Sequence, residues 1–137
     1  MTNETKDPAA NGLSVLIVDD SQAMRTFVRR VLDLAGLPLQ EVQEAEDGRR
    51  ALEALSAGRF DLVLSDINMP NMNGTEMCRA IRADSRFANV RVIVVSTDSS
   101  RQRMELMRAI GADGYLPKPF QPELLKFEVE RVMGCGS

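Results

Sequence analysis

Five short apolar runs alternate with segments of helical periodicity along this chain, and this alternation restricts the fold more than any other feature. The runs are Leu13–Val18, Leu39–Ala45, Leu62–Leu64, Val90–Val95 and the weaker Gly114–Leu116. Short runs of aliphatic and β-branched residues are typical of strands that are buried on both faces of a parallel sheet. Because helices connect parallel strands, the pattern predicts an α/β fold: a five-stranded parallel sheet with helices on both faces.

The segments between the runs have the spacing and the terminal residues of helices. After the first run, apolar residues from Met24 to Ala35 recur at helical intervals. Ser21 is the predicted N-cap of this helix, and Asp47 is the predicted N-cap of the next one. Further helices are predicted over Gly48–Ala57, about Thr75–Ala83, about Arg101–Ile110 and from Pro122 onward.

The length of 137 residues fits a single domain. We expect a flexible N-terminal tail over residues 1–11, one domain over residues 12–134 and a short C-terminal tail over residues 135–137. Cys78 and Cys135 have no metal-binding spacing. The first residues lack the apolar core of a secretory signal, and no apolar run is long enough to cross a bilayer.

The net charge of −3 argues against a basic surface for nucleic acid. The absence of a secretory signal, of a membrane-spanning run and of a metal-binding cysteine spacing leads us to expect a cytoplasmic protein. We expect that this protein does not bind nucleic acid by itself and does not insert into a membrane. The arginines of the first predicted helix are expected to form a solvated face.

Polar side chains follow the predicted strands at the points where the strands end. Asp19 and Asp20 follow the first strand, Asp66 follows the third, Ser96–Asp98 follow the fourth and Lys118 follows the fifth. In an open parallel sheet the carboxyl ends of the strands form one edge, and ligands bind there. We therefore expect these side chains to converge.

Carboxylates that lie close together repel one another unless a cation joins them. The chain contains no histidine, and oxygen ligands alone favour a hard cation such as Mg²⁺. Ser96 and Lys118 would offer a hydroxyl donor and a positive charge to a phosphoryl group. A carboxylate can itself be the nucleophile, so the residues predict metal-assisted phosphoryl transfer to an aspartate. The residue types alone do not say which aspartate attacks.

These motifs resemble those of response-regulator receiver domains, especially the stand-alone CheY-like form. The resemblance covers about Leu13 to Met133 and depends on Asp19-Asp20, the segment 66–74 (DINMPNMNG), Ser96 and the segment 111–120 (GADGYLPKPF). It implies a flavodoxin-like sheet with the strand order 2-1-3-4-5. It also implies two-component, phosphorelay signal transduction: a histidine kinase donates the phosphoryl group, and a downstream target protein responds by protein contact, as in chemotaxis.

The resemblance assigns roles at the acidic site. Asp66 matches the phosphoacceptor, so the protein would be an aspartyl-phosphate switch that catalyses only its own phosphorylation and dephosphorylation. Asp20 matches a direct Mg²⁺ ligand, and Asp19 matches a residue that acts largely through water. Asn68 would offer its backbone carbonyl to the metal.

The resemblance also assigns roles around the phosphoryl group. Ser96 and Lys118 match the two residues that contact it, and the Lys118-Pro119 bond would be cis. Tyr115 matches an aromatic residue whose rotamer reports the state of the site. Thr97 stands where the family often has a smaller residue, so we expect it to crowd the phosphoryl group and Thr97→Ala to speed phosphorylation or hydrolysis.

Two exposed apolar residues are expected beside Tyr115. Leu106 falls off the apolar face of its predicted helix, and Phe127 falls opposite the apolar stripe of the last helix. Since both helices flank the position where the family binds partners, Leu106, Tyr115 and Phe127 are hypothesised to form a docking surface.

Three alternatives remain open at this point. An aspartate-based phosphatase of the haloacid dehalogenase type needs an acid two residues after its nucleophile, where this chain has Asn68. A flavodoxin-like nucleotide binder needs a phosphate loop after the first strand, where Asp19 and Asp20 would repel phosphate. A pseudo-receiver that is never phosphorylated would not require the intact acidic set.

Overall fold

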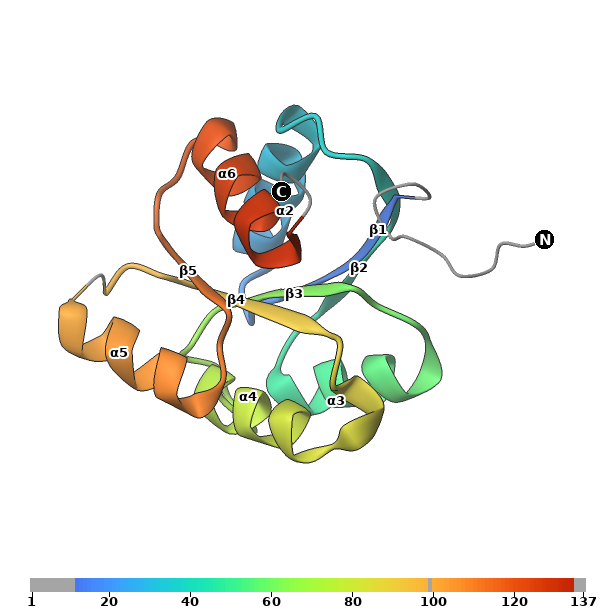
Figure 1. Ribbon diagram of the computed structural model, residues 1–137, viewed down its shortest axis with the longest axis vertical. Helices are drawn as coiled ribbons and strands as arrows, with labels where there is room; N and C mark the ends of the chain where they lie inside the picture. The colour runs from blue at the N-terminus through green and yellow to red at the C-terminus, as the bar shows by residue number, and fades with distance from the viewer. Residues whose placement is uncertain (1–11, 99, 135–137) are drawn as a thin grey trace.

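The computed structural model describes residues 12–98 and 100–134 and contains a five-stranded sheet in the order β2-β1-β3-β4-β5 (Figure 1). All neighbouring strands are parallel. The strands are β1 (Leu13–Val18), β2 (Leu39–Ala45), β3 (Leu62–Ser65), β4 (Arg91–Ser96) and β5 (Gly114–Pro117). The predicted parallel sheet and the strand order implied by the resemblance are confirmed.

Helices cover both faces of the sheet. In Figure 1, α2 and α6 lie on one face, and α3, α4 and α5 lie on the other. The bounds are α2 (Gln22–Leu34), α3 (Gly48–Ala57), α4 (Gly74–Ala83), the 3₁₀ helix η1 (Ser85–Phe87), α5 (Arg101–Ile110) and α6 (Pro122–Met133). The helix η1 was not predicted from the sequence, because a three-residue helix is too short to show an apolar period.

Two apolar cores result, one on each face of the sheet. Beneath α3, α4 and α5 the core includes Leu16, Val63 and Met77, whereas beneath α2 and α6 it includes Ile17, Leu64 and Leu125. Successive residues of β1 and β3 thus point into different cores, so every residue of these strands is buried. The carboxyl ends of the two strands are therefore held firmly, and the acidic residues follow directly.

The helix starts lie at the same edge as these strand ends. Ser21 caps α2 by accepting a hydrogen bond from the Met24 N–H, as predicted. Asp47 caps α3 in the same way, and α4 begins at Asn73 with a capping box formed with Glu76. Side-chain caps therefore surround the rim of the sheet on which the polar residues gather.

The predicted tails over residues 1–11 and 135–137, with Cys135, lie outside the described residues. Cys78 is buried within α4. Within the described part of the chain, no helix combines the length and the apolar character that a membrane crossing requires.

Candidate functional site

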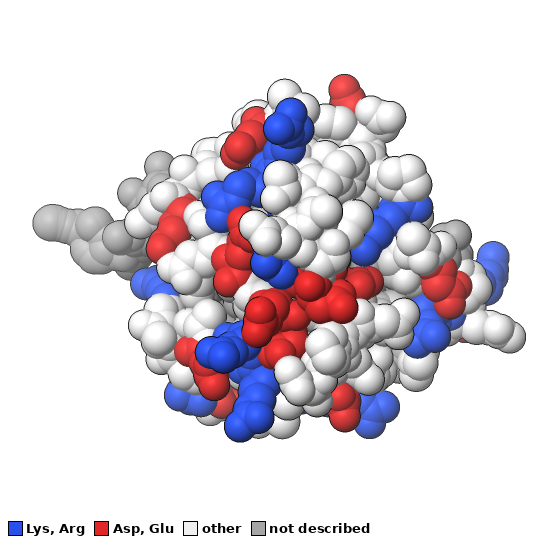
Figure 2. Space-filling model, turned by 180° about the vertical axis from the view of Figure 1, so that it is seen from behind, with Lys and Arg blue, Asp and Glu red and all other residues white. Residues whose placement is uncertain are grey.

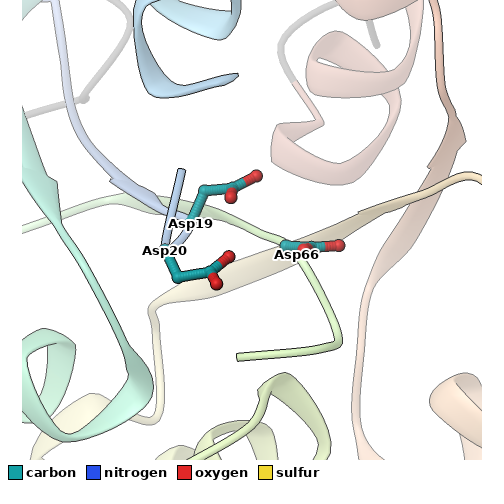
Figure 3. Close-up of side chains that lie close together, drawn as sticks. All are labelled: Asp19, Asp20 and Asp66. Carbon is teal, nitrogen blue, oxygen red and sulfur yellow. The ribbon is translucent and has the colours of Figure 1, made fainter. Parts of the chain in front are cut away.

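Three carboxylates meet where β1 and β3 end. Asp19 and Asp20 follow β1 and Asp66 follows β3, and one oxygen atom from each of the three lies within 4.8 Å of the others. Figure 3 shows the three side chains extending to the same side of the strand ends. In Figure 2, acidic side chains gather at the centre of the face shown, with basic ones beside them. The predicted convergence of the acidic residues is confirmed.

Lys118 reaches this cluster from the end of the edge strand β5. Its Nζ atom lies 3.3 Å from Oδ2 of Asp19 and 3.6 Å from Oδ1 of Asp66. The Lys118 N–H donates to the Ser96 carbonyl, and the Lys118-Pro119 bond is cis, as expected. Pro117 is compatible with this strand because β5 is an edge strand. The end of β5 therefore places the ammonium group among carboxylates that follow β1 and β3.

Burial raises the pKa of Asp66, and the nearby Asp19 carboxylate adds to this effect, although Lys118 acts in the opposite direction. A second positive charge at the cluster would therefore favour the ionised form of Asp66. The donor set consists of carboxylate oxygens, the ligands that hard divalent cations prefer. These residues fit Mg²⁺.

The two oxygens of Asp19 already have partners within the protein. Oδ1 accepts a hydrogen bond of 2.9 Å from the Ser21 N–H, and Oδ2 faces Lys118. Asp19 is buried, whereas Asp20 is exposed. The structure therefore leaves the carboxylate of Asp20 more accessible to a cation than that of Asp19.

The segment after Asp66 leaves the strand in a tight loop. The Gly74 N–H donates to the Ile67 carbonyl and closes the loop over residues 67–74. A Cβ atom on Gly74 would lie 2.3 Å from the Asp66 carbonyl oxygen, so this close approach requires glycine. Asn68 lies exposed within the loop.

Ser96 and Tyr115 both bind the Asp98 backbone. The hydroxyl of the buried Ser96 accepts a hydrogen bond of 3.0 Å from the Asp98 N–H. The hydroxyl of Tyr115 donates to the Asp98 carbonyl. One peptide segment at the end of β4 thus links the predicted phosphoryl contact to the predicted switch residue. Thr97, between Ser96 and Asp98 in the chain, is exposed. That it crowds the phosphoryl group stays a prediction.

The residues hypothesised to dock a partner lie around β5. Leu106 on α5 is 46% exposed and Phe127 on α6 is 63% exposed, so the prediction that both face outward is confirmed. A cleft of about 230 Å³ lies between α5 and α6, and its lining includes Tyr115 and Glu128. Glu128 also accepts a hydrogen bond from the Tyr115 N–H at the open edge of the sheet.

One expectation about the first helix was wrong for Arg25. Its side chain is only 15% exposed, pairs with Glu44 and donates through Nη1 to the Asp19 carbonyl at 2.6 Å. Arg25 was missed because its partner Glu44 lies on β2, and helical spacing shows only which residues share one face. The other arginine that binds Glu44 is Arg29.

Comparison with known proteins gives one family. The family model described as the response regulator receiver domain matches residues 15–130. The chain is 36% identical over 120 residues to the chemotaxis protein CheY of Pseudomonas aeruginosa, covering 88% of this chain and 95% of that protein. It is 37% identical over 125 residues to the chemotaxis protein CheY1 of Helicobacter pylori, covering 90% of this chain and 99% of that one.

Solved structures agree with these sequence relatives. The fold is similar to that of the chemotaxis response regulator CheY4 of Vibrio cholerae, with a TM-score of 0.77 and 41% identity over 88% of this chain and 98% of that one. It is also similar to the receiver domain of a sensor histidine kinase from Pseudomonas aeruginosa, solved with a magnesium ion in its active-site cleft (TM-score 0.78, 27% identity, 90% and 98% covered).

The family model spans most of the chain, and the relatives exceed 30% identity over nearly their whole length. The phosphatase alternative is not favoured by these findings. The chain therefore belongs to the family of response regulator receiver domains and is a CheY-like response regulator of two-component signal transduction.

Proposed function

We propose that the domain over residues 12–134 accepts a phosphoryl group on Asp66 and signals by changing the surface around β5. The observation that carries this proposal is the convergence of Asp19, Asp20 and Asp66 with the Lys118 ammonium at one edge of the sheet. Membership of the receiver family supplies the reaction class.

Mg²⁺ is the proposed cofactor, held by the carboxylates of Asp20 and Asp66 and by the backbone carbonyl of Asn68. Asp19 would act through water, which is supported by the partners that both of its oxygens already have. When bound, Mg²⁺ neutralises charge on the oxygens that take part in the transfer. The magnesium ion in the active-site cleft of the related receiver domain supports this assignment.

The proposed donor is a phosphohistidine of a histidine kinase, as in the receiver family. A carboxylate oxygen of Asp66 bonds to phosphorus as the bond between phosphorus and the histidine nitrogen breaks, and the imidazole leaves. Lys118, 3.6 Å from Asp66, pairs with one phosphoryl oxygen. The Ser96 hydroxyl donates to another. Water later hydrolyses the acyl phosphate, so the protein acts on its own phosphoryl group as a switch rather than as a metabolic enzyme.

The hydrogen bonds of Asp98 suggest how phosphorylation of Asp66 would change the protein surface around Tyr115. If the Ser96 hydroxyl turns to the phosphoryl group, its hydrogen bond with the Asp98 N–H is lost, and Tyr115 is bound to the same segment. A coupling free energy of about 1–3 kcal/mol is ordinary for such a switch. Leu106, Tyr115 and Phe127 would then present the changed surface to a downstream target protein.

The test uses acetyl phosphate, a small acyl phosphate, as the donor. The intact mass of the protein is measured after incubation with Mg²⁺ and after incubation with EDTA. We expect the mass of one phosphoryl group to be added with Mg²⁺ and little or none to be added with EDTA. An unmodified mass under both conditions, or steady turnover of a phosphate ester, would contradict the proposal.

A further inference from the structure

The carboxylate of Asp47 is buried at the start of α3 although it is not part of the acidic cluster. Its side chain lies at the end of the β2–α3 connection and is 3% exposed. Oδ1 accepts a hydrogen bond of 2.8 Å from the Arg50 N–H, which caps the helix. Oδ2 accepts a hydrogen bond of 2.7 Å from Nδ2 of Asn71. One oxygen therefore caps α3, and the other accepts a hydrogen bond from the loop that follows Asp66.

The loop has an unusual backbone at the residue that Asp47 binds. Asn71 has a φ of +65°, a left-handed conformation that residues other than glycine adopt at a cost in free energy, although asparagine tolerates it better than most. The Asp47 carboxylate holds the Asn71 amide group in this conformation through a hydrogen bond to a charged acceptor. The left-handed turn is thus stabilised by a contact from outside the loop.

A second contact joins the same two segments. The Gly48 N–H donates to the Met72 carbonyl at 3.0 Å. A Cβ atom on Gly48 would lie 2.8 Å from that carbonyl oxygen and 2.9 Å from Cγ of Met72, so the close approach depends on glycine. Asp47 and Gly48 together fix the end of the loop on the first turn of α3.

The other end of the loop is fixed by the hydrogen bond from Gly74 to the Ile67 carbonyl. Asn68, the proposed backbone ligand of Mg²⁺, lies between the two fixed ends. A site binds a cation more tightly when its carbonyl ligand is already oriented toward the cation before binding. Residues that hydrogen-bond to the segment carrying the ligand commonly fix this orientation.

We propose that Asp47 is a positioning residue, which acts through Asn71 to orient the loop that offers the Asn68 carbonyl to the divalent cation. This inference rests on the proposed Mg²⁺ site. Asp47 contributes no ligand atom, and its contribution is the loop conformation.

The test is the affinity for Mg²⁺, measured by titration calorimetry with MgCl₂ on the unphosphorylated protein. Asn71→Ala is the main variant, because it removes the hydrogen bond between Asn71 and Asp47 and leaves the Asp47 cap of α3 in place. We expect its dissociation constant for Mg²⁺ to rise about tenfold, the usual lower range for losing a partner behind a metal ligand. Asp47→Ala should raise the dissociation constant by a similar factor. The double variant should bind Mg²⁺ no more weakly than the single variant with the lower affinity.

Asp47→Asn tests rescue, because asparagine keeps the acceptor for the Arg50 N–H and can donate to a reversed Asn71 amide. We expect this variant to bind Mg²⁺ more tightly than Asp47→Ala. Asp84→Ala is the matched control: Asp84 also caps a helix, accepting from the Arg86 N–H at the start of η1, away from the acidic cluster. Its Mg²⁺ affinity should equal that of the wild type.

A purely structural role would lower the free energy of unfolding, measured with urea in EDTA, without changing the Mg²⁺ affinity of the folded protein. Wild-type Mg²⁺ affinity in Asn71→Ala would therefore overturn the positioning role and leave the proposed function intact. A wild-type protein that took up no Mg²⁺ would overturn the proposed metal site and this inference together.

Discussion

The Nζ atom of Lys118 lies 3.6 Å from Oδ1 of Asp66, which brings the end of the edge strand β5 to the end of the central strand β3. The same ammonium is 3.3 Å from Oδ2 of Asp19. Lys118 thus neutralises part of the charge of the acidic cluster before any ligand arrives. In the proposed reaction it pairs with a phosphoryl oxygen on Asp66.

Replacing Lys118 should slow phosphorylation far more than it affects folding. We expect Lys118→Ala to lower the rate of phosphorylation by acetyl phosphate about 100-fold, since it removes a charged group aimed at the reacting oxygens. The rate is measured from intact-mass time courses at saturating Mg²⁺. Lys126→Ala, at an exposed position on α6, is the control and should react at the wild-type rate. A Lys118→Ala rate within a factor of about two of the wild type would contradict this role.

The raised pKa of Asp66 predicts a pH-dependent gain in stability for Asp66→Asn in the absence of Mg²⁺. Burial is the main cause of the shift. Because the folded state binds the proton of Asp66 more tightly than the unfolded state does, stability falls as the pH rises from the ordinary carboxyl pKa, about 3.9, through the folded value.

Asp66→Asn should therefore have a higher free energy of unfolding than the wild type at pH 7 in EDTA. The difference should disappear as the pH is lowered below the ordinary range, where both states of the wild type are protonated. Urea unfolding at a series of pH values provides the measurement. A difference of the same size at every pH would show that ionisation is not its source.

Gly74→Ala should be destabilising, because its Cβ atom would lie 2.3 Å from the Asp66 carbonyl oxygen. We expect a loss of about 1–3 kcal/mol in the free energy of unfolding, the usual cost of forcing atoms into a packed site. The matched control is Gly58→Ala, whose Cβ atom would first meet Phe60 at 3.5 Å, an ordinary contact. The control should change the free energy by no more than about 0.5 kcal/mol. Equal urea midpoints for both variants would be the contrary result.

The exposed apolar residues beside β5 predict an effect on partner binding. Leu106→Glu and Phe127→Glu should each weaken the binding of a target protein about tenfold, a change of about 1.4 kcal/mol. The affinity is measured by calorimetry with a target captured on the phosphorylated protein. Leu34→Glu on α2 is the control, because Leu34 is 68% exposed but lies on a different helix. Unchanged affinity in both test variants would show that Leu106 and Phe127 do not form part of the docking surface.

Patterns within single segments were sufficient to predict the five strands, the five α-helices and the convergence of the acidic residues, but not the short helix η1. Asp19, Asp20, Asp66 and Lys118 follow strands, and the parallel topology alone brings strand ends together. The identity of the phosphoacceptor among the aspartates came from the family resemblance, since residue types do not distinguish one carboxylate from another.

Contacts between segments far apart in sequence were not predictable in this way. The hydrogen bond between Asp47 and Asn71 joins a helix cap to a loop, and either residue alone has an ordinary local role. The contact of Arg25 with the Asp19 carbonyl depends on how α2 sits on the sheet. Such pairs depend on packing geometry, which periodicity does not contain.

The most direct test of the central claim compares the wild type with Asp66→Asn after incubation with acetyl phosphate and Mg²⁺, by intact mass and by mapping of the modified peptide. Asp61→Asn, at the residue directly before β3 rather than directly after it, controls for the loss of a carboxylate. We expect one phosphoryl group on the wild type and on Asp61→Asn, located at Asp66, and none on Asp66→Asn. A wild type that gains no phosphoryl group, or an Asp66→Asn variant that is phosphorylated as fully as the wild type, would contradict the account.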